Sequence, residues 1–269
     1  MKKSLILANR VREHAIKMVN KGKSSHIGSV LSIVDIISVL YASVLNYRPE
    51  SSKWDGRDRF ILSKGHAGVG VYAVLAECGF FSTEKLKLHY QNDSCFSGHV
   101  SHKGIPGVEL STGSLGHGLP VGNGMAYAAK LDDKLHRIFV LMSDGELDEG
   151  SNWEAMLFSA HHKLNNITAI IDRNRLQSMD TTENTLALEP LIDKFEAFGW
   201  FVAEVNGHDH DDLYNALKSI HPDKPTMIIA NTVKGKGVSF MENEIAWHYR
   251  TPLDSDFETA IKEIVGASK

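Results

Sequence analysis

Two polar side chains that suit metal and phosphate chemistry each follow an apolar stretch of the chain. Asp144 and Gly145 come after residues 139–142, and Asn174 comes after residues 167–171. The spacing of 30 residues between Asp144 and Asn174 is about the length of one strand–helix–strand unit. In an open parallel sheet, ligands bind beyond the carboxyl ends of the strands. We therefore expect Asp144 and Asn174 to be neighbours at one edge of a sheet.

The residue types at these positions suit a hard cation. Mg²⁺ prefers oxygen ligands and commonly takes one or two from protein and the rest from phosphate and water. Asp144 offers a carboxylate, Asn174 an amide oxygen, and Leu176 a backbone carbonyl as a third candidate ligand. Gly145 has no Cβ atom, which lets the chain approach a phosphate closely. Because Asp-Gly and Asn are also common in turns and caps, the pair alone leaves a structural role open.

The elements that must position these residues can be predicted from apolar patterns. Helical spacing predicts helices at 10–20, 29–45, 69–78, 150–164, 189–198 and 210–220, and apolar runs predict strands at 138–142, 167–172, 201–205 and 226–230. Repeated strand–helix–strand order predicts an α/β fold, a parallel sheet with helices on both faces. Residues 91–118 lack periodicity and are expected to form a binding loop. No linker divides the chain, so residues 1–269 are expected to form a single domain.

Composition excludes several classes of function. The chain has 29 Lys and Arg against 33 Asp and Glu, with no basic run, so no binding to nucleic acid or to a membrane surface is expected. We expect no window with the ~18 apolar residues of a membrane span. The apolar start at residues 4–8 is too short for a signal peptide. Cys78 and Cys95 lie outside zinc or disulfide spacing, and a cytoplasmic location is expected.

Fourteen histidines are present, several of them directly after Gly or Ser. Imidazole can donate hydrogen bonds to hydroxyls and phosphates, and its ordinary pKa suits proton transfer near neutrality. Most histidines are nevertheless expected to be structural, and His161 and His162 on a predicted helix are assigned to this group.

Several motifs in order resemble the transketolase family. The run from Ser143-Asp144-Gly145 to Asn174 is similar to the thiamine-diphosphate motif, which begins Gly-Asp-Gly and ends in Asn about 30 residues later, although Ser143 replaces the first glycine. The similarity extends from about Arg12 to about Leu253 and includes Ser63-Lys64-Gly65-His66, Ser97-Gly98-His99, Pro106-Gly107-Val108-Glu109, Ser111-Thr112-Gly113-Ser114-Leu115-Gly116 and Gly235-Lys236-Gly237.

The resemblance implies a thiamine-diphosphate-binding fold and the cofactors thiamine diphosphate and Mg²⁺, with Ca²⁺ or Mn²⁺ as alternatives. It implies metal ligation by Asp144, Asn174 and Leu176, and cofactor binding by His66, Gly113, Ser114, Leu115, Asp144, Gly145, Asn174 and His248. It also implies catalytic roles: His26 and His248 contact the donor sugar, while His66 and His99 line the diphosphate and reaction centre. His102 and His117 are left without a role, and the acidic residues Glu149 and Glu154 match either an interface or a capping position.

The activity implied is transfer of a two-carbon ketol unit from a ketose phosphate to an aldose. Transketolases normally continue into a pyrimidine-binding and a C-terminal domain, whereas this chain ends at Lys269. We therefore expect these domains on a partner, a C-terminal transketolase subunit, in an α₂β₂ assembly. The isolated chain is expected to be inactive.

Two alternatives from other classes remain. The α subunit of a thiamine-diphosphate-dependent 2-oxo acid dehydrogenase also carries the metal motif on a separate chain, but His66, Ser97-Gly98-His99 and His248 favour transketolase. A non-catalytic assembly module is less favoured, because every proposed metal ligand is present.

Overall fold

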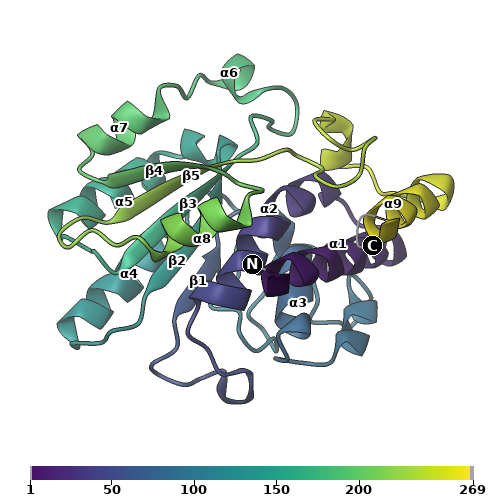
Figure 1. Ribbon diagram of the computed structural model, residues 1–269, viewed down its shortest axis with the longest axis horizontal. Coiled ribbons are helices and arrows are strands. Elements are labelled where there is room, and N and C mark those ends of the chain that lie inside the picture. Colours follow the sequence, from purple (N-terminus) through teal and green to yellow (C-terminus); the bar gives the residue numbers. More distant parts are fainter. Residues whose placement is uncertain (1, 267–269) are drawn as a thin grey trace.

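The computed structural model describes residues 2–266, which form a five-stranded sheet surrounded by helices (Figure 1). The strands are β1 Arg59–Leu62, β2 Ile138–Ser143, β3 Ile167–Arg173, β4 Phe201–Asn206 and β5 Thr226–Asn231. The helices are α1 Lys2–Gly22, α2 Ile27–Val39, α3 Gly68–Glu77, α4 Gly118–Leu131, α5 Gly150–His161, α6 Thr182–Thr185, α7 Leu191–Ala197, α8 His210–Lys218 and α9 Asp254–Gly266. Shorter helical turns are η1 Leu40–Val44, η2 Pro49–Ser51, η3 Gly65–Ala67, η4 Thr83–Leu88, η5 Gly145–Asp148 and η6 Ile245–His248.

The strands are all parallel and stand in the order β1-β2-β3-β5-β4. The register pairs Ser143 with Asp172 and Asp172 with Ala230, so β2, β3 and β5 end level with one another. The predicted parallel α/β fold is confirmed, and each of the four predicted strands extends one residue further than expected. Polar residues that follow these strands therefore gather at one edge of the sheet.

Alternate residues of the strands enter two apolar cores on opposite faces of the sheet. On β2, Phe139 and Leu141 pack into the core that contains α2 and α8, whereas Val140 and Met142 pack into the core that contains α4, α5 and α7. Helices α1, α3 and α9 form an outer layer over α2, and Figure 1 shows α9, near the end of the chain, beside α1 at its start. Helices cover both faces, as predicted.

Helix α2 is the central helix of the first face, and every residue in it is buried. The window Ile27–Val44 has a mean hydropathy of 2.0 and is long and apolar enough to cross a membrane by composition, so the expectation of no such window was wrong. In the structure, 89% of this window is buried. A buried core helix can be as long and as apolar as a membrane-spanning one, so length and hydropathy alone are weak evidence for a membrane span.

The other predicted helices are present with shifted ends. Helix α1 begins at Lys2 rather than near residue 10, so the apolar residues at the start of the chain belong to it. Helix α5 ends at His161, three residues before the predicted end. Between η4 and α4 the described chain contains no helix or strand, which fits the expected loop at 91–118.

Candidate active site

A cavity of about 230 Å³ lies where the ends of β2 and β3 meet the start of α2 and the segment after β5. All but one of the site residues expected from the sequence line this cavity: His26, His66, His99, Gly113, Leu115, Asp144, Gly145, Asn174, Leu176 and His248. Ser114 is the exception, and it lies exposed in the same loop as its two neighbours. The fold thus brings together residues that are up to about 220 positions apart in the sequence.

Asp144 lies at the base of this cavity, directly after β2, and is only 2% exposed. Its Oδ1 accepts a hydrogen bond from the Gly145 N–H at 2.8 Å, and its Oδ2 accepts one from the Arg175 N–H at 2.5 Å. Burial, followed by the neighbouring Asp172 carboxylate, raises the pKa of Asp144 to about 6. A bound divalent cation would offset both effects, because it favours the ionised carboxylate.

Asn174 is oriented by a carboxylate beneath it. Its Nδ2 donates to Asp172 Oδ2 at 3.0 Å, and its Oδ1 accepts from the Leu176 N–H at 3.1 Å. Because an amide nitrogen can only donate, its bond to Asp172 fixes which end of the amide carries the oxygen. That oxygen therefore lies on the side of the loop after β3, where a metal ligand is expected.

Asp172 is completely buried and holds several donors together. It accepts hydrogen bonds from Lys64 Nζ at 2.5 Å, from Ser32 Oγ at 2.7 Å and from the Thr232 hydroxyl. Burial opposes its charge, but the Lys64 ammonium and these hydrogen bonds outweigh that effect and lower the pKa of Asp172. The result is an ion pair beneath the cavity that joins α2, β3 and the segments after β1 and β5.

Two buried lysines, Lys64 and Lys234, also line this cavity. Neither was expected at the site from the sequence. Lys64 is 0% exposed and Lys234 is 1% exposed. Lys234 Nζ donates to the carbonyl oxygens of Leu176 and Gln177, each at 2.9 Å. Burial and then the Lys64 charge lower the pKa of Lys234 to about 8. Two ammonium groups in one cavity wall fit an anionic ligand such as a diphosphate.

A signal for both lysines was present in the sequence. Lys64 lies within the Ser63-Lys64-Gly65-His66 motif, and Lys234 directly precedes the Gly235-Lys236-Gly237 motif. Lysine side chains are mostly exposed in proteins, so neither stood out from its type alone.

The donor atoms fit a divalent cation that binds a diphosphate. Asp144, Asn174 and Leu176 offer a carboxylate, an amide and a carbonyl oxygen along one wall of the cavity. The Lys234 ammonium contacts the Leu176 carbonyl and so places a positive charge at the oxygen where a metal would bind. A metal at that oxygen would stand beside the Nζ ammonium, and repulsion between the two positive charges would weaken this hydrogen bond.

The four histidines expected at the reaction centre form one cluster. The ring centroid of His26 lies 5.2 Å from that of His66, 5.6 Å from that of His99 and 5.0 Å from that of His248. His26 precedes α2 with a left-handed φ of 73°, and its N–H donates to the His248 carbonyl at 2.7 Å. This backbone bond fastens η6 to the start of α2, although the two are far apart in the sequence.

Burial keeps three of the four imidazoles neutral, those of His26, His66 and His248. Burial, followed by the nearby His99, Lys234 and Lys64, lowers the pKa of His26 to about 4. Burial and then Lys234 lower the pKa of His248 to about 3, and burial and then Lys64 hold the pKa of His66 well below its ordinary value. The pKa values of these three histidines thus lie below the ordinary value of imidazole, and their side chains can donate or accept hydrogen bonds without carrying charge.

The loop that contains Gly113–Leu115 is held from below by Glu146, which is 0% exposed. Glu146 Oε1 accepts from the Gly116 N–H at 2.9 Å and from the Ser63 hydroxyl, and Oε2 accepts from the Ser143 N–H at 3.2 Å. Burial raises the pKa of Glu146 despite these bonds. Glu146 was not expected from the sequence, since two of its three partners, Ser63 and Gly116, are distant in the chain.

The residues left without a role are exposed or structural. His102, His117, Glu149 and Glu154 are all exposed. His162 packs its ring at 4.3 Å from that of Phe158, measured between centroids, which fits its expected structural role.

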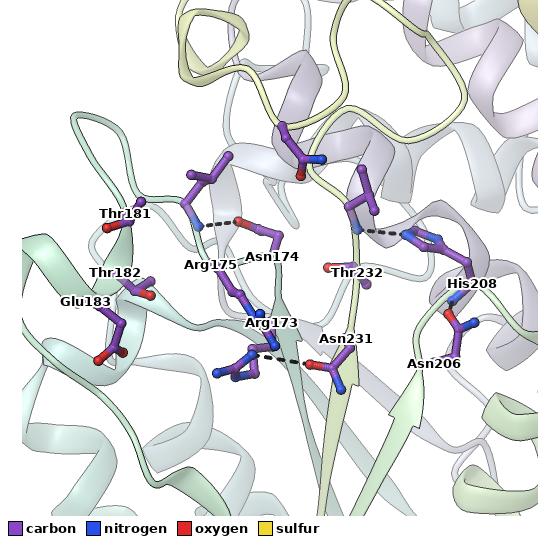
Figure 2. Close-up of a pocket in the computed structure, with 13 residues that line it drawn as sticks. Arg173, Asn174, Arg175, Thr181, Thr182, Glu183, Asn206, His208, Asn231 and Thr232 are labelled. Carbon is purple, nitrogen blue, oxygen red and sulfur yellow. Dashed lines mark hydrogen bonds between the residues drawn. The ribbon is translucent and has the colours of Figure 1, made fainter.

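A second, larger hollow of about 580 Å³ lies at the ends of β3, β4 and β5. Figure 2 shows Arg173 and Arg175 on one side of it and Asn231 and His208 on the other. Asn174 lines both hollows, but the larger one contains neither Asp144 nor the histidine cluster. We therefore place the candidate active site in the smaller cavity.

The fold and the cavity define a class of protein, an α/β domain with oxygen donors and two buried lysines beside a histidine cluster. Comparison with known proteins agrees. Residues 3–269 match the family model "Transketolase, thiamine diphosphate binding domain". The chain belongs to the transketolase family and carries its thiamine-diphosphate-binding domain.

Similar proteins include transketolase subunits of nearly the same length and a longer transketolase. The chain is 42% identical to an apulose-4-phosphate transketolase subunit of Phocaeicola vulgatus, covering 94% of this chain and 90% of that protein. It is 36% identical to the 6-deoxy-6-sulfo-D-fructose transketolase subunit SqwG of Clostridium sp., covering 96% and 94%. The crystal structure of transketolase from Campylobacter jejuni superposes with a TM-score of 0.91 at 33% identity, covering 100% of this chain and 43% of that one. The chain thus spans less than half the length of that solved transketolase.

Proposed function

We propose that this chain is the diphosphate-binding subunit of a split transketolase, which transfers a two-carbon ketol unit from a ketose phosphate to an aldose acceptor. The observation that carries the proposal is the histidine cluster directly beside the Asp144 and Asn174 loop in one cavity. Two relatives of nearly the same length are named as transketolase subunits, which supports the assignment to a separate subunit.

Asp144, Asn174 and the Leu176 carbonyl would hold Mg²⁺, or Ca²⁺ or Mn²⁺, against the cofactor's diphosphate. Lys234, once displaced from the Leu176 carbonyl, and the fixed Lys64 would balance the phosphate charge. Backbone N–H groups of the Gly113–Leu115 segment, Ser114 included, would serve the diphosphate, and Glu146 holds the adjacent Gly116 in place.

Thiamine diphosphate, when bound, supplies a stabilised carbanion, and the protein supplies position and charge. His26 and His248 bind the donor sugar next to the carbon that reacts, as neutral hydrogen-bond partners. His66 and His99 line the reaction centre, where an imidazole can pass a hydroxyl proton or donate to a developing oxyanion. Neutral His26, His66 and His248 avoid three further positive charges beside two lysines.

The partner is a C-terminal transketolase subunit that carries the pyrimidine-binding domain, in an α₂β₂ assembly with the active site between subunits. Residues 1–269 then form a single diphosphate-binding domain. We also propose a cytoplasmic location, which the two free thiols, Cys78 and Cys95, support. The 2-oxo acid dehydrogenase and the assembly-module alternatives gain no support from the relatives, which are named as transketolases.

The test is ketol transfer by the purified chain alone, by its partner alone and by the two together. A neighbouring reading frame that encodes a chain of about 300 residues with pyrimidine-domain motifs would identify the partner. The proposal predicts transfer from ketose phosphates by the mixture only. Transfer by the chain alone, or turnover of a 2-oxo acid in place of a ketose, contradicts it.

A further inference from the structure

Tyr249 lines the same cavity and stands beside two of the four histidines, although the roles above do not use it. Its ring centroid lies 4.7 Å from that of His248 and 5.8 Å from that of His26, with tilted, edge-on geometry to both. The residue is 63% exposed. Tyr249 therefore covers the two histidines assigned to the donor sugar from the open side of the cavity.

The backbone on either side of Tyr249 is fixed. Trp247 is buried, and its Nε1 donates to the Phe240 carbonyl at 2.9 Å. Arg250 lies over the Trp247 ring at 4.9 Å from its centroid and pairs with Asp256 at 3.2 Å. An exposed ring on a backbone fastened in this way is presented in one place rather than left to move with a free loop.

The phenol group of Tyr249 is free to recognise a ligand. Within residues 2–266, no hydrogen bond to its hydroxyl is formed, and the ring is the only large aromatic surface that lines this cavity besides the histidines. Tyrosine combines an apolar ring face with a polar tip, which suits a sugar chain that has both C–H and hydroxyl groups.

We propose that Tyr249 determines donor specificity: its ring packs against the carbinol carbons of the donor ketose, and its hydroxyl bonds to a hydroxyl of that chain. This inference rests on the proposed function, because it concerns the donor held by His26 and His248. This chain then contributes to donor specificity through a side chain close to the reacting carbonyl. The ligand class is a polyhydroxylated ketose phosphate.

The test compares two donors in the complex of this chain with its pyrimidine-domain partner. One is the best donor from a panel of ketopentose and ketohexose phosphates; the other is hydroxypyruvate, which has the ketol group but no carbinol chain. Tyr249→Phe is expected to lower kcat/KM for the ketose phosphate about tenfold and to leave that for hydroxypyruvate within about twofold, as loss of one hydrogen bond predicts. Tyr249→Ala is expected to lower the ketose phosphate value further, since the ring is also lost.

Tyr90→Phe is the matched control, since Tyr90 is 57% exposed and lies outside the cavity. Thiamine diphosphate affinity, measured in parallel, is expected to stay at the wild-type value in each variant. An equal fall in kcat/KM for both donors would mean that Tyr249 only supports packing, and it would overturn the inference. An unchanged ratio of the two kcat/KM values in both Tyr249 variants would also overturn it. A wild-type complex that turns over neither donor would instead contradict the proposed function itself.

Discussion

Asn174 Nδ2 donates a hydrogen bond to Asp172 Oδ2 at 3.0 Å, so the amide proposed as a metal ligand is oriented by a carboxylate that lies wholly outside the cavity lining. Asp172 is in turn paired with Lys64 at 2.5 Å. The metal site is thereby joined to a buried ion pair, and changes in that pair are expected to reach the cofactor through Asn174.

Asp172→Asn is the first test of this link. The change leaves the buried Lys64 ammonium without its counter-charge, which costs about 3–5 kcal/mol of unfolding free energy. It also replaces one of the two acceptor oxygens at position 172 by an NH₂ group, so the donors Lys64, Ser32, Thr232 and Asn174 must share one oxygen and Asn174 is oriented less firmly. Mg²⁺-dependent cofactor affinity is therefore expected to fall about 10–100-fold. Urea unfolding and calorimetric titration measure the two effects.

Asp193→Asn, at an exposed position, is the matched control and is expected to change neither quantity. If the Asp172 variant does not fold, Thr232→Val removes a single donor to the same carboxylate. Wild-type stability in Asp172→Asn would contradict the role of the ion pair.

Lys234→Met tests the proposal that the Lys234 ammonium leaves the Leu176 carbonyl and binds the diphosphate. Because Nζ contacts carbonyl oxygens here and is proposed to move to the diphosphate, its loss is expected to weaken thiamine diphosphate binding about tenfold or more while the fold is kept. Lys236→Met is the control, since Lys236 lies two residues away and pairs with Glu242 at 3.3 Å outside the cavity. Equal cofactor affinity in the two variants would exclude a role for Lys234 in binding the diphosphate.

Glu146→Gln is expected to loosen the loop that contains Gly113–Leu115. An amide cannot accept from Gly116 and Ser143 N–H groups with both of its ends, so one buried donor is left unpaired at a cost of about 1–3 kcal/mol. Amide hydrogen exchange at Gly116 is the measurement, and faster exchange is the expected result. Glu154→Gln, at an exposed position, should leave that exchange rate unchanged.

The pH dependence of stability follows from the neutral histidines. The pKa of His26 is about 4 in the folded chain against an ordinary value of 6.5, so as the pH falls below 6.5 the unfolded chain binds a proton first. The contribution of His26 to the unfolding free energy therefore decreases as the pH is lowered from about 6.5 to about 4. Above pH 6.5 this contribution is constant.

His26→Asn removes this contribution, so its unfolding free energy is expected to fall less steeply than that of the wild type over the same window. Urea titrations at a series of pH values measure both slopes. Parallel curves above pH 7 serve as the internal reference, and parallel curves throughout would show that His26 is not held neutral.

Much of the fold could be predicted from local patterns. The strands at 138–142 and 226–230 are short apolar runs bounded by turn residues, and buried parallel strands have this pattern. Once the sheet is parallel, its geometry alone places Asp144 beside Asn174, because both follow neighbouring strands. That is why the cavity contains nearly all the residues expected from the sequence.

The groups beneath the cavity could not be predicted in the same way. Asp172 gains its role from Ser32, 140 residues away, and from Lys64, 108 residues away, and no local pattern links them. The lowered pKa values of His26 and His248 likewise depend on burial and on Lys234, which are properties of the folded chain. Long-range packing decides these features, and a single sequence does not display it.

The most direct test of the central claim is a calorimetric titration of thiamine diphosphate into the complex of this chain and its partner, with Mg²⁺ and again with EDTA. We predict saturable binding, one cofactor per diphosphate-binding chain, that requires the metal and is lost in Asp144→Ala and Asn174→Ala. Binding of equal strength with EDTA, or in either variant, would contradict a metal-bound diphosphate at Asp144 and Asn174.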